Sequence, residues 1–221
     1  MKIDIARQPL VPAFMTLFAL AVAAMCAGIP VSDTSGAVRD ALPLLGGQLA
    51  RFQAAYPVWS KFAAGFMLLF TGMCAGRITI RYNLYTVGTC LPIPLYAIVA
   101  CGIATGGNYL AGFAASMLLA LATKNYCRAF CNGYGFDAIF RASLYLGLMP
   151  LVYAPALPLL LLLPLAVLLF RRTFREVVVA TAGLLLPIFT ACYVSWGSGA
   201  EFTAPLVTVC LLYTSPSPRD S

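Results

Sequence analysis

Eight cysteines and a complete lack of histidine limit the chemistry that this chain can do. Histidine is the usual general base, proton shuttle and haem ligand, so none of these roles is expected here. Cys127 and Cys131 stand one helical turn apart, but two thiolates alone do not complete a tetrahedral zinc site. The other cysteines are typical of small apolar packing residues. The sequence therefore predicts no metal centre and no bound cofactor.

Asp33 and Asp40 are the carboxylates best placed for catalysis, because they lie in a polar segment, residues 31–57, that also contains a candidate interfacial helix. Multi-pass enzymes that use polyprenyl-linked sugars typically carry an acidic residue in such a first external loop. Solvated loop carboxylates are the alternative interpretation, which the sequence favours because isolated motif matches are often accidental. No acidic residue falls in the middle of an apolar run, where it would mark an ion path. We expect no catalytic residue, with Asp33 and Asp40 as the alternative.

The segment 31–57 also carries an apolar stripe with three- and four-residue spacing, opposite Asp40 and Arg51. Its members are Val38, Leu42, Leu45, Leu49 and Phe52. This spacing predicts an amphipathic helix lying in the membrane interface. Pro43 and Gly46 weaken the helix.

Two further patterns have a packing or anchoring interpretation. Gly72–Gly76 and Gly102–Gly106 have the GxxxG spacing that permits close helix approach, and we expect packing within the chain. Residues 125–137 join two apolar runs with aromatics, glycines and charges. A functional loop is one interpretation, and an interfacial aromatic anchor is the favoured one.

The composition of the chain is typical of a membrane protein. Hydrophobic residues make up 62% of the chain and charged residues 10%, against about half and a quarter in soluble domains. Residues 1–210 are predicted to form one integral membrane domain, an all-α bundle with about seven membrane segments and a truncated eighth. The predicted runs are Leu10–Pro30, Trp59–Gly76, Leu84–Thr105, Tyr109–Thr123, Ala142–Phe170, Glu176–Trp196 and the short Thr203–Tyr213.

The run from Ala142 to Phe170 is ambiguous. As one helix it would be about 43 Å long, which exceeds a hydrocarbon core of about 30 Å. Pro150, Pro155 and Pro158 interrupt its front half. We favour two passes or a re-entrant hairpin that turns near residues 153–158, with arms at about 142–152 and 157–170.

The phase of the basic residues predicts the orientation. With a cytoplasmic N-terminus, ten basic residues lie inside and Arg39, Arg51 and Lys61 lie outside, which is a strong positive-inside bias. Arg219 is not counted, because it belongs to the C-terminal tail that is predicted to be non-native. The ten are Lys2, Arg7, Arg77, Arg81, Lys124, Arg128, Arg141, Arg171, Arg172 and Arg175. The net charge of +7 is thereby explained by orientation and by contact with anionic lipid headgroups. Nucleic acid is not an expected partner, whereas other membrane proteins are.

The latter half of the chain carries a resemblance. Its elements are Phe136-Asp137-Ala138, Tyr153-Ala154-Pro155, Arg175-Glu176 and the segment Gly183–Pro187. Over residues 77–195 the chain resembles a family of uncharacterised multi-pass inner-membrane proteins of Gram-negative bacteria, known as a domain of unknown function. The resemblance implies localisation in the bacterial inner membrane and adds no catalytic residue.

Residues 211–221 resemble translated sequencing-adapter read-through, so we expect a fragment with a non-native tail. A genuine disordered tail is the alternative. The expected function is that of a non-catalytic structural or accessory component of the cell envelope. The alternatives are a polyprenyl-lipid-dependent glycosyltransferase or polymerase of envelope glycans, and a transporter subunit.

Overall fold

The computed structural model describes residues 10–26, 44–82, 90–104, 108–131, 135–161 and 173–214. This part of the chain consists of helices and the turns between them, as the apolar runs predict. The elements are α1 (Leu10–Cys26), α3 (Leu44–Ala55), α4 (Pro57–Arg81), α5 (Pro92–Ala104), α6 (Tyr109–Cys131), α7 (Phe136–Val152), the 3-10 helix η1 (Ala154–Leu161), α9 (Phe174–Gly197) and α10 (Ala204–Thr214).

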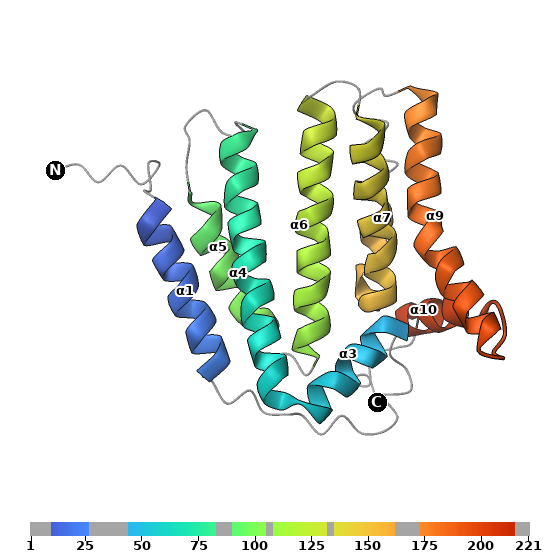
Figure 1. The fold of residues 1–221 in the computed structure, drawn as a ribbon, viewed down its shortest axis with the longest axis horizontal. Helices are drawn as coiled ribbons and strands as arrows, with labels where there is room; N and C mark the ends of the chain where they lie inside the picture. The colour runs from blue at the N-terminus through green and yellow to red at the C-terminus, as the bar shows by residue number, and fades with distance from the viewer. Residues whose placement is uncertain are drawn as a thin grey trace.

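The long helices lie side by side in an elongated bundle, with α1, α5 and α4 on one side and α6, α7 and α9 on the other (Figure 1). The helices α3 and α10 cross the lower end of this bundle in the same view. Contacts between α4 and α6 join the two sides. Helices α4 and α6 therefore have neighbours on two sides, whereas α9 lies at the edge of the row.

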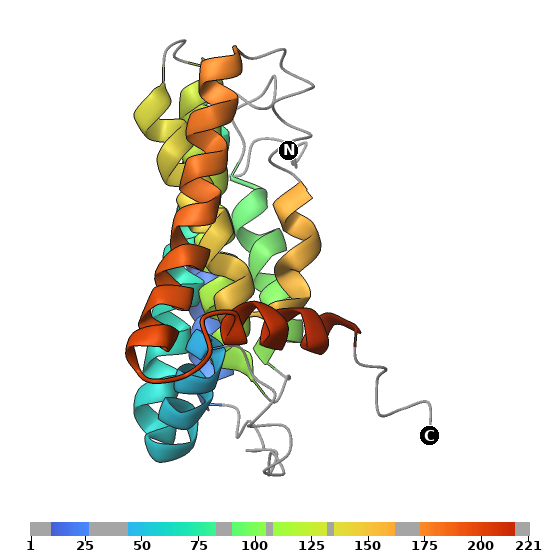
Figure 2. The ribbon, with the colours of Figure 1, turned by 90° about the vertical axis from the view of Figure 1, so that its right-hand side faces the viewer.

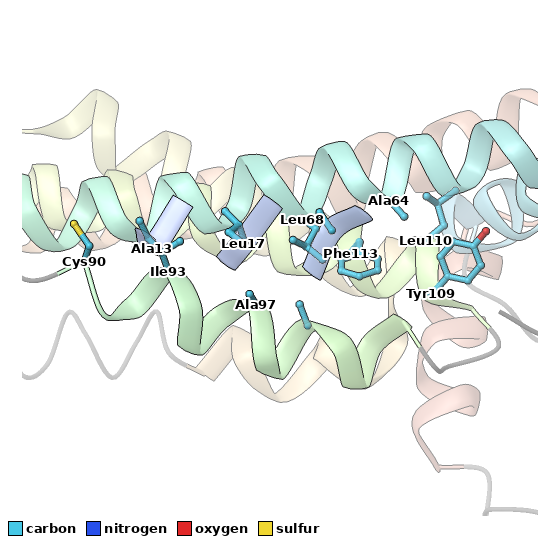
Figure 3. Packing of buried hydrophobic residues seen from close by; sticks show 12 residues of the cluster. Ala13, Leu17, Ala64, Leu68, Cys90, Ile93, Ala97, Tyr109, Leu110 and Phe113 are labelled. Atoms are coloured by element: carbon cyan, nitrogen blue, oxygen red, sulfur yellow. The ribbon is translucent and has the colours of Figure 1, made fainter. Parts of the chain in front are cut away.

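A first core lies between α1, α4, α5 and the start of α6 (Figure 3). Leu17, Leu68, Ile93 and Phe113 are at most 1% exposed and interlock at its centre. Many of the other members of this core are alanines, whose small side chains let the helix backbones approach closely. This core packs α1, α4 and α5 against one another and holds the start of α6 against them.

A second core joins α6, α7 and α9, and glycines set its closest approach. A Cβ atom at Gly147 of α7 would collide with the carbonyl of Leu184 in α9, and one at Gly183 would lie 2.7 Å from the carbonyl oxygen of Phe140. Because these neighbours are backbone atoms, only glycine fits at either position.

The Gly72–Gly76 spacing also serves packing within the chain, as expected. A Cβ at Gly72 would lie 2.7 Å from the Leu17 side chain of α1. A Cβ at Gly76 would lie 2.6 Å from the Ile93 side chain of α5. Gly106 lies outside the described residues, so the Gly102–Gly106 spacing stays a prediction.

The ambiguous run 142–170 is not one continuous helix. Helix α7 ends at Val152, Tyr153 is extended with φ −142° and ψ 100°, and η1 follows. Helices α7 and α9 start at the same end of the bundle (Figures 1 and 2). The chain therefore returns to that end between Tyr153 and Phe174, as the hairpin requires. Residues 162–172, which include most of the second predicted arm, lie outside the described part.

Two of the described helices, α4 with 25 residues and α9 with 24, are long and apolar enough to cross a membrane. The remaining membrane segments of the predicted seven stay a prediction. Two helices differ in extent from the predicted apolar runs. Helix α6 continues eight residues past Thr123 to Cys131, because Lys124, Asn125 and Arg128 are all compatible with helix. Helix α5 begins at Pro92, inside the predicted run Leu84–Thr105. Helix α10 crosses the lower end of the bundle (Figure 2).

Candidate functional site: a basic pocket

The helix ends that carry basic residues lie together at the upper end of the bundle in Figure 1, which we call the basic end. Helices α4 and α6 finish there, and α7 and α9 begin there. The described basic residues of these segments are Arg77, Arg81, Lys124, Arg128, Arg141 and Arg175. Cations at the ends of α4 and α6 also complement the negative C-terminal pole of each helix.

A pocket of about 630 Å³ opens at this end between α1, α4, α5 and α6. We call it the basic pocket, and it is lined by Leu10, Phe70, Met73, Cys74, Gly76, Arg77, Ile80, Arg81, Ile93 and Lys124. Its size falls in the range of small-molecule sites, about 300–1,000 Å³.

The three cations of the basic pocket come from two helices. Arg77 and Arg81 are one turn apart on α4, so both side chains lie on the same face. Lys124 reaches the pocket from α6, more than 40 positions later in the chain. Helix packing therefore brings together charges that the sequence analysis treated only as orientation signals. The four-residue spacing of Arg77 and Arg81 was the sequence feature that could have indicated part of this pocket.

The charge of the basic pocket is not neutralised by the described residues. Among them, Arg77, Arg81 and Lys124 form no ion pair, and no carboxylate lines the pocket. The ion pair that the described part does show joins Arg141 Nε to Asp137 Oδ1 at 3.0 Å, on the exposed surface of α7. The arrangement can therefore bind an anion at one end and an aliphatic group along its apolar wall.

An aromatic groove of about 520 Å³ lies toward the other end of α4, and the sequence analysis missed it. Phe52 of α3 and Tyr56 have ring centroids 5.6 Å apart, and Trp59 and Phe62 follow with centroids 6.4 Å apart. Aromatic residues of this kind concentrate at the membrane–water interface. The three- to four-residue spacing from Phe52 to Phe66 was the signal that could have shown the groove.

The predicted catalytic alternative, Asp33 and Asp40, lies outside the described residues, as do Val38 and Leu42. A catalytic role for Asp33 and Asp40 therefore stays a prediction.

A helix, α3, covers the later part of the predicted stripe, in spite of Pro43 and Gly46, and its place in a membrane interface stays a prediction. Pro43 directly precedes the helix, a place where a missing N–H costs nothing. The residues of α3 that face the bundle are not those of the predicted apolar stripe. Gly46 and Gln53 are buried, and Leu110 N donates to Gln53 Oε1 at 3.5 Å, whereas Leu45 and Phe52 remain 36% and 41% exposed. Of the described members of the stripe, Leu49 is the one that packs against the cores.

Cys127 and Cys131 occupy successive turns of α6, as their spacing predicts. Cys131 is exposed and Cys127 half-buried. No group of three or more cysteine, aspartate or glutamate side chains forms a metal site in the described part. Cys127 lies beyond the predicted span, and burial, followed by the neighbouring Cys131 thiol, raises its pKa above the ordinary value.

The predicted loop 125–137 is mostly helical, which corrects its interpretation as a connection. Residues 125–131 belong to α6, and Asn125 Nδ2 donates to the Leu121 carbonyl at 2.9 Å. Asp137 lies in the first turn of α7, where an acidic side chain complements the positive pole of the helix. Tyr126 and Phe130 stack with ring centroids 5.8 Å apart, and Tyr126 packs against the second core. The role of these rings as an interfacial anchor stays a prediction.

No family model, curated protein or solved structure matches this chain.

Proposed function

We propose that this chain is a multi-pass protein of the bacterial inner membrane, with the basic end in the cytoplasm, that acts as a non-catalytic structural or accessory component of the envelope. The observation that carries the proposal is the distribution of side-chain size. Along α4 the buried face is built largely of Ala64, Gly65, Gly72 and other small residues, whereas Phe66 is 67% exposed.

The same distribution recurs in α9. Ala180, Gly183 and Ala191 are buried, while Phe189 and Tyr193 are 59% and 66% exposed. In water the large apolar side chains would be buried first, because they gain most from leaving the solvent. In lipid that driving force is absent, and small residues that permit close packing occupy the helix contacts. Lipid is therefore the solvent that fits this surface.

The charges of the basic end support the proposed orientation. Cytoplasmic segments carry an excess of lysine and arginine, so the N-terminus, residues 77–83, 124–141 and 171–175 face the cytoplasm. Residues 31–57 and 197–201 then face the periplasm. A non-catalytic role is supported by the basic pocket, because its described lining residues are cations and apolar side chains and include no carboxylate.

Cysteine labelling tests the orientation. In a cysteine-free background, Ala200→Cys and Thr173→Cys place single thiols at two exposed positions on opposite ends of α9. An impermeant maleimide applied to intact spheroplasts is expected to label position 200 and not position 173. Both positions should react after the cells are broken, which controls for accessibility. Labelling of position 173 alone in intact spheroplasts would show that the orientation is reversed.

The glycosyltransferase or polymerase alternative depends on Asp33 and Asp40. A specific observation keeps it open: α3 begins at Leu44, four positions after Asp40, and lies across the end of the bundle (Figure 1). A general base there would deprotonate an acceptor hydroxyl.

The double variant Asp33→Asn, Asp40→Asn separates the two functions. For a non-catalytic component we expect unchanged surface glycan, measured by gel profile in a strain that expresses only the variant gene. Protein abundance is measured by immunoblot in the same membranes. Loss of glycan at normal abundance would favour the enzyme.

A further inference from the structure

We propose that the basic pocket binds one anionic phospholipid of the cytoplasmic leaflet, with the phosphate held by Arg77, Arg81 and Lys124 and an acyl chain against the apolar wall of α4. This inference rests on the proposed membrane placement and adds a specific ligand and site to it.

The lining of the pocket changes character along α4. Phe70 and Met73 lie at its apolar part, and Arg77 and Arg81 lie at the basic end. The eleven positions from Phe70 to Arg81 correspond to about 16 Å along the helix axis. A ligand that fills the pocket is therefore amphipathic, with an anionic group at one end and a hydrocarbon chain that continues toward the centre of the bilayer.

The pocket has a closed floor and an open side. Cys74 and Ile93 form buried parts of the lining at 8% and 1% exposure. Leu10, Met73 and Ile80 line it as well and are 38–50% exposed. Because these exposed walls are apolar, the open side faces lipid in the proposed placement. An acyl chain can enter from the bilayer without crossing a polar surface.

Charge complementarity selects an anionic headgroup. Arg77 and Arg81 are exposed and Lys124 is half-buried, and none has an ion-pair partner among the described residues. Two guanidinium groups one turn apart can each donate two parallel hydrogen bonds to phosphate oxygens. A zwitterionic lipid would bring its own cation into a pocket that already holds three. A free phosphate would leave the apolar wall unfilled, so the lipid is the better occupant.

Lipid titration followed by native mass spectrometry tests this assignment. The full chain is purified in a neutral detergent, depleted of lipid, and titrated with phosphatidylglycerol or with phosphatidylcholine of identical acyl chains. We expect phosphatidylglycerol to bind roughly tenfold more tightly or better, because each basic residue near the headgroup adds about a fivefold preference. Equal binding of the two lipids would overturn the inference.

A pair of matched variants separates a site from a general attraction. Arg77→Gln with Arg81→Gln removes two charges from the pocket, and Arg128→Gln with Arg175→Gln removes two exposed charges from the same end outside it. The first pair is expected to abolish the preference for phosphatidylglycerol, and the second to leave it unchanged. An equal loss in both pairs would mean diffuse attraction and would contradict the site. Helical content, measured by circular dichroism, controls for folding, and Lys124→Gln provides a milder variant.

Glycerol 3-phosphate distinguishes a lipid from a soluble phosphate. It carries the anion without the acyl chains, so at the lipid's own concentration it should not displace phosphatidylglycerol. Displacement at equal concentration would assign the pocket to a soluble ligand and overturn the inference. The labelling of positions 173 and 200 is read independently. A correct orientation without lipid preference would remove the lipid site and leave the proposed function in place.

Discussion

Buried hydroxyl groups in this bundle mostly donate to the helix that carries them. Ser143 Oγ donates to the Ile139 carbonyl at 2.8 Å, and Thr79 Oγ1 donates to the Ala75 carbonyl at 2.9 Å. Ser60 differs, because its Oγ also lies 2.5 Å from the hydroxyl of Tyr109 and so links α4 to α6. Polar groups satisfied in this way can be buried without a charged partner. Helix association then depends on close packing of small side chains.

The two neighbouring thiols of α6 are predicted to differ in reactivity. A raised pKa lowers the thiolate fraction at a given pH, and the thiolate is the nucleophile. Burial raises the pKa of Cys127, and Cys131 is exposed, so Cys127 should be alkylated more slowly at pH 7.5. The rate at Cys127 should continue to rise with pH above the ordinary thiol pKa.

Single-cysteine variants that retain only Cys127 or only Cys131, in neutral detergent, allow each maleimide rate to be measured separately. Denatured samples should show equal rates, which controls for intrinsic chemistry. A Cys127 rate equal to that of Cys131 in the folded protein would contradict the prediction.

Among the elements, α7 and α9 form the closest helix pair, because glycines lie where their backbones meet. Pro187 interrupts the hydrogen bonding of α9 near this contact, and Pro150 lies in the last turn of α7. The two helices start at the same end of the bundle, so the segment between them must return along it. The glycines therefore allow α7 and α9 to pack directly against each other.

Replacing Gly147 tests the importance of this contact. Gly147→Val would push a side chain into the backbone of Leu184, and overpacking of this kind typically costs about 1–3 kcal/mol. Gly197→Val is the matched control, because a Cβ there has no neighbour within 4 Å. Unfolding in sodium dodecyl sulfate, followed by circular dichroism, should shift to lower detergent fraction for Gly147→Val and change little for Gly197→Val. Equal midpoints for the two variants would contradict the packing argument.

At the scale of the whole molecule, the two ends of the bundle differ in chemistry. Arginine and lysine gather at the basic end, while Tyr56 and Trp59 on α4 and Tyr193 and Trp196 on α9 lie toward the opposite end. Helix α4 with its 25 residues is about 37 Å long, enough to pass through a hydrocarbon core of about 30 Å. The basic pocket and the aromatic groove lie toward opposite ends of this one helix, as anchors in two interfaces would.

Sequence alone was sufficient for the helical fold of the described residues and for most helix positions, because a helix satisfies the backbone N–H and C=O groups of a long apolar run within the run itself. It also placed the break near Tyr153, since prolines there cannot continue a helix. It was less accurate at the end of α6, where charged residues that favour helix extend it beyond the apolar run.

Only the tertiary structure decided which face of each helix packs inward and which charges share a site. A helix that is apolar on all sides carries little periodic signal, so the inward face of α4 became evident only from the burial of its small residues. The basic pocket could not be predicted from the sequence either. Arg77 and Arg81 could be paired by spacing, but Lys124 joins them through the contact between α4 and α6. Local sequence patterns do not show contacts between residues so far apart in the chain. These contacts are determined by the packing of the helices.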